Sequence, residues 1–331
     1  MKSPKIKIIS DRQINPNLLR DRTIVIIGYG SQGRAQALNL RDSGFTPLIG
    51  LPVGSRSRQI AKRDGFAATT PSKAAPQADI VAVLIPDHKH KELFDNELYP
   101  VMKAGQIYIF AHALSVHFKL IEQPPKIDYV LVAPHSPGIR LRERYLAGEA
   151  VAAFIGKTDE SSKRSLRSAA AYAKAIGCSR YGLIETNFAN EAIGDIFGEQ
   201  AVLCGGLAAL LRAGFNTLVK AGIPSENAYL ECVYQLDLIV ELIKKYGIDG
   251  MYQRISTTAA YGGLMAESKI INDKSKKAMT SLIKQIEDGR FTAGLMADYK
   301  NSFKKLNQKR KKSHSHALDE MARYFDTTFN R

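Results

Sequence analysis

The pattern G-x-G-x-x-G occurs near the N-terminus, formed by Gly28, Tyr29, Gly30, Ser31, Gln32 and Gly33. It follows a run of apolar and β-branched residues and precedes a segment whose apolar residues recur at helical spacing. At such a strand-to-helix junction the first glycine permits a tight turn, the second lets the backbone approach a pyrophosphate, and the third allows close helix–strand packing. The N–H groups that begin the helix favour phosphates. The motif therefore predicts a dinucleotide site, although a tight turn without a ligand would use the same glycines.

The loop after the next predicted strand suggests which dinucleotide binds. Residues 50–59 read GLPVGSRSRQ and contain no acid that would hydrogen-bond the ribose hydroxyls of NAD. They contain instead Ser55, Arg56, Ser57 and Arg58. Hydroxyl and guanidinium groups suit a 2′-phosphate dianion, which a carboxylate would repel. We therefore expect NADPH, unless both arginines are ordinary solvated loop residues.

Oxygen-bearing side chains at helical spacing form a second candidate site in the C-terminal half. Asp195 and Glu199 are four residues apart, which places both carboxylates on one helix face. Glu231 and Gln235 repeat this spacing. Two such helices facing each other can hold Mg²⁺, which prefers carboxylate oxygens and retains several waters. Surface acids at helical spacing are the alternative, but apolar residues such as Ile196 lie between the first pair.

The first half of the chain must position the dinucleotide. Short runs rich in β-branched residues alternate there with helix-length segments, and the runs cover residues 23–30, 46–51, 78–86, 105–112 and 128–135. Strands separated in this way form a parallel sheet with helices on both faces. We therefore predict an α/β Rossmann domain with a doubly wound parallel sheet over residues 1–182.

The second half must position the oxygen-bearing side chains. After about residue 182 the apolar residues follow a helical period, and Gly and Pro punctuate the segments. No strand-like alternation recurs. We therefore predict an all-helical domain over residues 183–331.

Composition limits the class of protein. The chain has 331 residues, 45% hydrophobic and 24% charged, which suits two folded domains. Cys178, Cys204 and Cys232 form no CxxC pattern, which favours reduced thiols. No apolar run reaches the roughly 18 residues of a membrane span, and the charged, proline-broken N-terminus is unlike a secretory signal. We expect a cytoplasmic protein that has no membrane partner.

The balance of 47 Lys and Arg against 32 Asp and Glu gives a net charge of +15. Residues 300–312 hold seven of the basic residues and no acid. A basic protein can favour nucleic acids or anionic substrates, but no aromatic platform or nucleic-acid fold accompanies this run. We therefore expect a solvated helix face or tail and no nucleic-acid partner.

Five segments, in this order and spacing, resemble the short bacterial form of ketol-acid reductoisomerase. They are GYGSQGRAQALNLRDSG, FAHALSVHF, VAPHSPG, DIFGEQAVLCGG and ECVYQLDLIVELI. The resemblance covers roughly residues 10–300, and the DIFGEQAVLCGG segment is highly diagnostic. It implies that the helical domain contains a deep knot, which is rare in proteins. It also implies a homodimer or higher homo-oligomer whose active sites combine helices from two subunits.

The resemblance further implies a two-step reaction in valine, leucine and isoleucine biosynthesis. An alkyl group first migrates within 2-acetolactate or 2-aceto-2-hydroxybutyrate, assisted by two Mg²⁺ ions. NADPH then reduces the rearranged 2-keto acid to a 2,3-dihydroxy acid. By position, Asp195 would bridge both metal ions and Glu199 would ligate the first and take part in catalysis. Glu231, with Gln235 in the same shell, would ligate the second metal ion from the partner subunit.

The resemblance also implies roles for residues other than the metal ligands. His112 stands where the family has an active-site histidine, which makes polar contacts and handles protons. His117 stands at a second histidine position that is more often structural. Ser256 matches the serine that holds the substrate carboxylate, and Gly138 of VAPHSPG would lie against the cofactor.

The sequence departs from the family at several of these positions. His135 replaces a lysine of the metal–substrate network and would have to act in its place. Gln235 replaces a carboxylate ligand, which removes a negative charge and weakens the attraction for a dication. Thr257 and Ala260 replace an aspartate and a glutamate.

These departures leave three functions open. The first is a working reductoisomerase. The second is a related NADPH-dependent 2-keto-acid reductase that lacks isomerase activity, because the cofactor loop and first-metal ligands are intact. The third is a non-catalytic NADP-binding paralogue.

Overall fold

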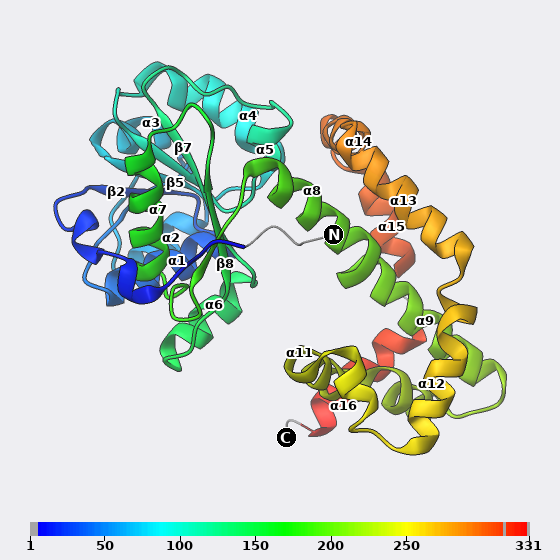
Figure 1. The fold of residues 1–331 in the computed structure, drawn as a ribbon. Helices are drawn as coiled ribbons and strands as arrows, with labels where there is room; N and C mark the ends of the chain where they lie inside the picture. Colours follow the sequence, from blue (N-terminus) through cyan, green and yellow to red (C-terminus); the bar gives the residue numbers. More distant parts are fainter. Residues whose placement is uncertain (1–5, 314–315, 330–331) are drawn as a thin grey trace. The chain divides into compact units, whose positions relative to one another are not determined.

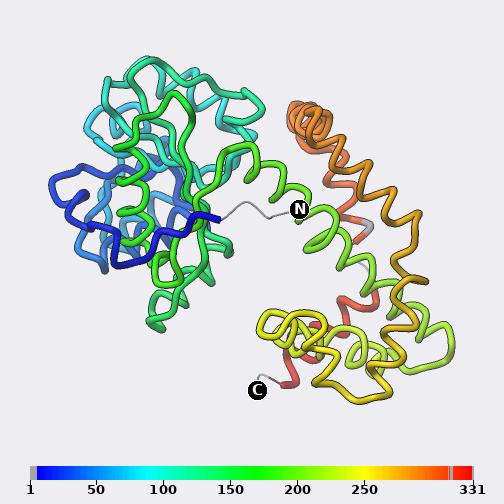
Figure 2. Tube along the Cα trace, in the orientation of Figure 1, coloured from blue at the N-terminus to red at the C-terminus, as the bar shows by residue number. Residues whose placement is uncertain are grey.

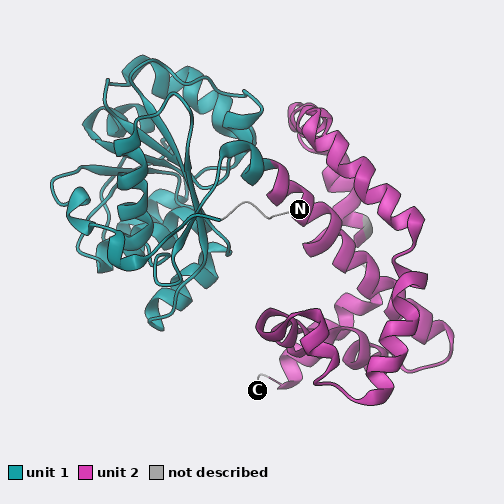
Figure 3. Cartoon of the chain, viewed as in Figure 1, with its two compact units in different colours: residues 1–192 teal, residues 193–331 magenta. Residues whose placement is uncertain are grey.

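The computed structural model describes residues 6–313 and 316–329. The chain forms two compact units, residues 1–192 and residues 193–331, which Figure 3 colours separately. The charged N-terminal segment considered above includes residues 1–5, which lie outside the described residues.

The first unit contains a sheet of nine strands within the described residues, in the order β1-β9-β8-β7-β6-β5-β2-β3-β4. The strands are β1 (Ile8–Ile9), β2 (Ile24–Ile27), β3 (Leu48–Gly50), β4 (Ala68–Thr69), β5 (Ile80–Val83), β6 (Ile107–Phe110), β7 (Asp128–Pro134), β8 (Ala153–Lys157) and β9 (Leu183–Glu185). Neighbouring strands are parallel except for the antiparallel pairs β1–β9 and β7–β8. The predicted Rossmann-type parallel sheet is therefore confirmed, with two antiparallel pairings added on one side.

Helices cover both faces of this sheet (Figure 1). They are α1 (Ser31–Asp42), α2 (Ser57–Arg63), α3 (Pro71–Ala74), α4 (His90–Leu93), α5 (Leu114–His117), α6 (Gly138–Leu146) and α7 (Lys163–Ala175). Shorter 3₁₀ or π segments are η1 (Asp11–Gln13), η2 (Pro16–Leu19), η3 (Ala75–Gln77), η4 (Asp87–Lys89), η5 (Phe94–Leu98) and η6 (Tyr99–Val101).

The residues of β2 explain why both faces are covered. Ile24 and Ile26 belong to a core cluster with residues of α1, α6 and α7, whereas Val25 and Ile27 belong to a second cluster with residues of α3 and η5. A strand between two helical layers must be apolar at every position, because successive side chains point to opposite faces. The uninterrupted apolar run of β2 meets this condition.

The strand order reverses at β2, the third strand from the β4 edge of the sheet. β2 belongs to the blue part of the trace in Figure 2. β2 pairs in parallel with β3 on one side and with β5 on the other. Open α/β sheets bind ligands outside the carboxyl ends of their strands at such a reversal. The fold therefore gathers the glycine-rich turn and the segments after β3 and β5 around one crevice.

The second unit is helical throughout its described residues. α8 (Phe188–Gly198) leads into it, followed by η7 (Glu199–Leu203), α9 (Gly205–Lys220), α10 (Ser225–Tyr229), η8 (Leu230–Tyr234), α11 (Leu236–Tyr252), α12 (Thr257–Ile270), α13 (Asp273–Glu287), α14 (Arg290–Lys300), α15 (Lys304–Ser313) and α16 (Ala317–Phe329). η7 and η8 are π-helical. β9 follows the expected boundary near residue 182 and still pairs with β8, so the sheet extends past that boundary.

The second unit leaves much apolar surface uncovered. Few of its large apolar side chains are buried, among them Ile196, Phe215, Met251, Ile286 and Phe325. Many more are exposed, including Val202, Leu203, Leu210, Tyr234, Leu238, Ile248, Tyr261, Leu264, Met265, Ile270, Tyr324 and Phe329. Extended apolar surface of this kind marks an interaction site.

One helical stretch, Phe188–Lys220, is long and apolar enough to cross a membrane by length and composition, with 33 residues and a window of mean hydropathy 1.6. The sequence contains no uninterrupted apolar run there because Glu191, Asp195 and Glu199 interrupt it. Charged side chains at membrane depth are costly and face protein or water. Two of the candidate metal ligands, Asp195 and Glu199, therefore lie on this apolar helical stretch.

Candidate functional site

The glycine-rich turn has the conformation that its pattern predicts. Gly28 has a φ of +101°, and a Cβ there would lie 2.6 Å from the carbonyl oxygen of Leu84. A Cβ at Gly33 would lie 2.3 Å from the carbonyl oxygen of Gly28. No described atom lies within 4 Å of a Cβ placed at Gly30, so the backbone there is open to a ligand. The turn, the close packing and the accessible backbone of a dinucleotide loop are all present.

Gly138 brings a second helix N-terminus to this turn. A Cβ on Gly138, the first residue of α6, would lie 2.1 Å from the carbonyl oxygen of Ser31. Gln32 donates a hydrogen bond from Nε2 to the carbonyl oxygen of Ser136 at 2.7 Å. The structure thus places these residues together, and their contact with a cofactor stays a prediction.

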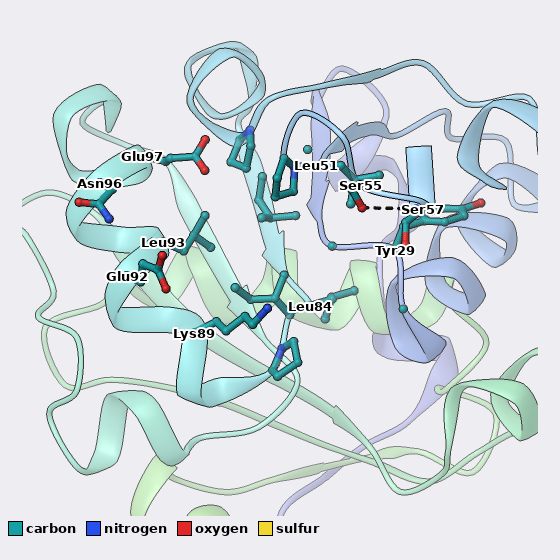
Figure 4. Close-up of a pocket in the computed structure, with 18 residues that line it drawn as sticks. Tyr29, Leu51, Ser55, Ser57, Leu84, Lys89, Glu92, Leu93, Asn96 and Glu97 are labelled. Carbon is teal, nitrogen blue, oxygen red and sulfur yellow. Dashed lines mark hydrogen bonds between the residues drawn. The ribbon is translucent and has the colours of Figure 1, made fainter. Parts of the chain in front are cut away.

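A first cleft of about 420 Å³ opens at the carboxyl ends of β2 and β3 (Figure 4). Its lining includes Gly28, Tyr29, Gly30, Leu51, Ser55, Ser57, Leu84, Ile85, Pro86, Lys89, Glu92 and Glu97. Ser55 comes from the loop after β3 and Ser57 begins α2, whereas Lys89, Glu92 and Glu97 come from η4, α4 and η5. The cleft is large enough for a mononucleotide half of a dinucleotide.

Arg56, in the loop after β3, and Arg58, in the first turn of α2, occupy different positions. Arg58 donates hydrogen bonds from Nη2 to the carbonyl oxygen of Leu51 at 2.6 Å and from Nε to that of Pro52 at 2.9 Å. Its guanidinium closes the loop on itself. Arg56 is exposed, and neither arginine lines the first cleft. Of the predicted phosphate ligands, the structure brings only Ser55 and Ser57 to the cleft wall.

A second cleft of about 330 Å³ adjoins the first and shares with it Gly30, Leu84, Ile85 and Pro86. Its lining also includes Ser31, Gln32, Asp87, His90, Ala111, His112 and Pro134. The predicted histidine His112 therefore lies along the same crevice as the glycine-rich turn.

Glu191 holds His112 in place. Its side chain is only 4% exposed, and it accepts a hydrogen bond from Nδ1 of His112 at 3.2 Å and another from the backbone N–H of Ala113 at 2.8 Å. Sequence reasoning missed this residue. The available signal was its position four residues before Asp195, inside an apolar helix where an acid needs a partner.

His135 and His117 lie apart from this pair. His135 is exposed, lines neither cleft and packs edge-on against the Phe154 ring at a centroid distance of 4.3 Å. His117 packs against Phe118 at 4.6 Å, and partial burial lowers its pKa. The catalytic role expected of His135 stays a prediction.

Asp195 and Glu199 are both exposed, on α8 and at the start of η7. No group of three or more His, Cys, Asp or Glu side chains in the described part of this single chain could hold a metal ion. A metal ion at Asp195 and Glu199 would therefore draw further ligands from water or from another copy of the chain.

Glu231 and Gln235 form a contact with each other on η8 and at its end. Nε2 of Gln235 donates a hydrogen bond to Oε2 of Glu231 at 3.0 Å. The neutral amide thus engages an oxygen that a metal ion would otherwise use. An aspartate or glutamate at position 235 would instead have offered a second carboxylate.

Ser256 caps the N-terminus of α12. Its Oγ accepts a hydrogen bond from the backbone N–H of Ala259 at 3.1 Å, and its side chain is exposed. Thr257 and Ala260, which depart from the family pattern, lie in the first turn of the same helix. A substrate carboxylate at Ser256 would meet the partial positive charge of this helix end.

The chain matches two family models. Residues 18–182 match the NADPH-binding domain of acetohydroxy acid isomeroreductase, and residues 188–329 match the C-terminal domain of ketol-acid reductoisomerase. The solved structure of an NADH-preferring ketol-acid reductoisomerase from an uncultured archean is 37% identical, with a TM-score of 0.93. The alignment covers 98% of this chain and 100% of that one.

More distant structures share the fold alone. An NAD-binding semialdehyde dehydrogenase protein from Cupriavidus necator is 16% identical, with a TM-score of 0.65 over 81% of this chain and 98% of that one. A pyrroline-5-carboxylate reductase from Coxiella burnetii is 17% identical, with a TM-score of 0.56 over the same shares, 81% and 98%.

Proposed function

This chain belongs to the ketol-acid reductoisomerase family of branched-chain amino-acid biosynthesis, and we propose that it rearranges an acetohydroxy acid and reduces the product with NADPH. The observation that carries the proposal is the crevice formed by the two clefts, which share Gly30 and reach His112. A dinucleotide along this crevice would have its nicotinamide end beside the histidine.

His112 is the group proposed to handle the proton that accompanies reduction. Reduction of a keto group needs a proton on the new hydroxyl oxygen, and histidine exchanges protons near neutral pH. The Glu191 carboxylate orients the ring and stabilises its protonated form. Glu191 is therefore proposed as a positioning residue.

For the cofactor, we propose NADPH with Ser55 and Ser57 at the 2′-phosphate and Arg56 closing over it. The guanidinium of Arg58 already donates hydrogen bonds to loop carbonyl oxygens. Arg56 would therefore supply the positive charge that pairs with the 2′-phosphate. The archaeal relative is NADH-preferring, so the preference needs a direct test. Arg56→Ala should weaken binding of 2′,5′-ADP about tenfold and leave 5′-AMP unchanged in calorimetry. Tighter binding of NADH than of NADPH by the unaltered chain would contradict the proposal.

Asp195 and Glu199 fit a Mg²⁺ site, because hard dications prefer carboxylate oxygens and both side chains are exposed on one helix. A bound Mg²⁺ would act as a Lewis acid on the keto and hydroxyl oxygens of the substrate. Glu231 of a second copy and Ser256 would complete the site, with Ser256 on the substrate carboxylate.

The contact between Gln235 and Glu231 favours a second candidate function, a 2-keto-acid reductase without isomerase activity. Loss of one carboxylate weakens the site for a second dication. Reduction would then continue while alkyl migration fails.

NADPH oxidation with two substrates separates these functions. The reductoisomerase turns over both 2-acetolactate and 3-hydroxy-3-methyl-2-oxobutyrate, whereas the reductase turns over the second compound alone. A chain that binds NADPH and turns over neither, with Mg²⁺ present, would be a non-catalytic paralogue.

We also propose that the chain works in the cytoplasm as a homodimer or higher homo-oligomer. The exposed apolar side chains of the second unit and the apolar helix Phe188–Lys220 would pack against another copy. Light scattering should give at least twice the chain mass in detergent-free buffer. A monomer, or a chain that partitions into detergent, would contradict this assembly.

A further inference from the structure

A series of three hydrogen bonds runs from the core of the first unit to the wall of the second cleft. The Tyr172 hydroxyl, on α7, donates to Oε1 of Gln36, on α1, at 2.8 Å. Nε2 of Gln36 donates to Oε1 of Gln32 at 3.0 Å, and Nε2 of Gln32 donates to the carbonyl oxygen of Ser136 at 2.7 Å. Tyr172 and Gln36 line neither cleft, so any effect they have on a ligand passes through this series.

The direction of each bond in the series follows from its outer end. The carbonyl oxygen of Ser136 only accepts, so the amide nitrogen of Gln32 faces it and the amide oxygen of Gln32 faces Gln36. The Gln36 amide is then held with its nitrogen toward Gln32 and its oxygen toward Tyr172. Burial raises the pKa of the Tyr172 hydroxyl, which therefore keeps its hydrogen and donates it. All three bonds point the same way, and each amide is oriented by the next group inward.

The inner part of the series is shielded from water. The Tyr172 side chain is fully buried and that of Gln36 is 1% exposed, whereas Gln32 is half-buried. A buried acceptor that loses its donor is costly, because no water replaces the bond. Without the Tyr172 hydroxyl, Oε1 of Gln36 would have no donor, and the Gln36 amide would turn to find one. This movement would take the donor away from Oε1 of Gln32.

The outer end of the series lies where the glycine-rich turn meets the loop after β7. Gln32 lines the second cleft together with Pro134, the last residue of β7. Ser136 follows in the loop that leads to Gly138, where a Cβ would lie 2.1 Å from the carbonyl oxygen of Ser31. The hydrogen bond from Gln32 to Ser136 therefore joins two segments that touch, and it holds this wall of the cleft in one position.

We propose that Tyr172 and Gln36 are positioning residues for the dinucleotide, which fix the Gln32 amide and the loop after β7 before the nicotinamide half of the cofactor enters. Gly30 lines both clefts, so a pyrophosphate would lie at their junction and the nicotinamide half in the second cleft. A wall that is already ordered binds more tightly, because less freedom is lost on binding. This inference rests on the proposed dinucleotide function.

The variant Tyr172→Phe tests the proposal, because it removes the hydroxyl and keeps the buried ring. Tyr145→Phe is the matched control. The Tyr145 hydroxyl, on α6, shares a hydrogen bond of 2.7 Å with Ser43, which lies at the other end of α1 from Gln32. Calorimetry on the full chain would compare NADP⁺ with 2′,5′-ADP and NAD⁺ with 5′-AMP, since the shorter ligands lack the nicotinamide half.

We expect Tyr172→Phe to weaken binding of the complete dinucleotide about 3- to 10-fold, the range of one neutral hydrogen bond. Binding of the shorter ligand should stay unchanged, which also shows that the first cleft is folded. Gln36→Met should cause a similar loss, and the double variant should lose no more than Gln36→Met alone, because both substitutions interrupt one series. Tyr145→Phe should bind both ligands as the unaltered chain does.

Equal losses for the complete and the shorter ligand, or no loss for either, would overturn the proposal. The same loss in Tyr145→Phe, or additive losses in the double variant, would also overturn it. If the unaltered chain binds NAD⁺ and not NADP⁺, the proposed cofactor preference fails, and NAD⁺ with 5′-AMP decides the role of Tyr172. An unaltered chain that binds neither dinucleotide would refute the proposed function together with this inference.

Discussion

Glu191 is buried beside His112 and accepts hydrogen bonds from the histidine ring and from the backbone N–H of Ala113. Removing a carboxylate from a buried charged network leaves its donors poorly satisfied. The ring of His112 would then lose both its orientation and the charge that stabilises its protonated form. Loss of the Glu191 carboxylate should therefore slow the chemical step and leave cofactor binding little changed.

Glu191→Gln should therefore lower kcat for reduction of 3-hydroxy-3-methyl-2-oxobutyrate by about 10- to 100-fold. The affinity for NADPH should change little, because Glu191 lines neither cleft. Steady-state kinetics and calorimetry measure the two effects separately. Glu143→Gln, in an exposed ion pair with Arg140, is the control. A wild-type kcat in the Glu191 variant would show that Glu191 has no part in the reaction.

Asp64, at the C-terminal end of α2, connects this helix to the glycine-rich turn and to α1. Its carboxylate accepts hydrogen bonds from Arg34 at 2.7 Å and from the Tyr29 hydroxyl at 2.9 Å. Arg34, and after it the Tyr29 hydroxyl, hold the pKa of Asp64 below its ordinary value. The contribution of these bonds to stability is present above the unfolded pKa of about 3.9 and is lost as pH falls through the folded value.

Asp64→Asn should lower the free energy of unfolding at pH 7 by about 1.5–3 kcal/mol, the range for hydrogen bonds to a charged group. The difference between variant and wild type should shrink below pH 4, because the carboxyl of the unfolded wild-type chain then begins to protonate while that of the folded chain stays ionised to lower pH. Urea unfolding at several pH values measures both. A difference that stays constant down to pH 2 would show that the charge of Asp64 is not responsible.

Among the elements, η7 and η8 stand out because both are π-helical and both carry candidate metal ligands, Glu199 and Glu231. Short π-helical segments inside α-helices often occur at functional sites. On η8, the hydrogen bond from Gln235 to Glu231 ties the two side chains together. A carboxylate at position 235 would repel Glu231 in the absence of a cation and attract a dication.

Gln235→Glu should therefore increase Mg²⁺ affinity several-fold and raise turnover of 2-acetolactate relative to 3-hydroxy-3-methyl-2-oxobutyrate. Magnesium titration by calorimetry and the paired assays measure these changes. Gln253→Glu is a close control, because Gln253 donates the same kind of hydrogen bond to Asp249, four residues earlier. An equal gain in the control would mean that added charge alone, and not its place on η8, attracts the ion.

At the scale of the whole molecule, the second unit exposes an apolar helix face. Tyr261, Leu264 and Met265 lie three and four residues apart on α12 and are 70%, 50% and 54% exposed. Residues at this spacing share one helix face. An apolar helix face of this kind is stable when a partner covers it, and a second copy of the chain is the proposed partner.

Leu264→Lys should dissociate the oligomer and abolish turnover, while NADP⁺ still binds to the separately folded first unit. Sedimentation and calorimetry measure the two properties. Leu146→Lys is the control, because Leu146 is 66% exposed on α6 of the first unit. Full activity of a Leu264→Lys monomer would show that one chain holds a complete site.

Features that depend on near neighbours in the chain were already determined by the sequence. The apolar runs predict β2, β5, β6 and β7, and the glycine spacing predicts the turn at Gly28. These signals are local because side-chain direction repeats every two residues in a strand and every 3.6 in a helix. The Rossmann-type fold and a helical second half follow from such patterns, whereas the family follows from the five segments that resemble it, and all three are confirmed. The short strands β4 and β9 carry too few residues for a period to show.

Only the tertiary structure decided which side chains meet. Glu191 contacts His112 from 79 residues away, through the packing of α8 against the end of β6. Arg58 turns to loop carbonyls, and His90 keeps one nitrogen without a partner among the described residues. Each outcome depends on burial and on the direction of a hydrogen bond in three dimensions, which a residue's type and spacing do not specify. The motif residues lie close together in the sequence, whereas the groups that hold them in place lie far from them in the sequence.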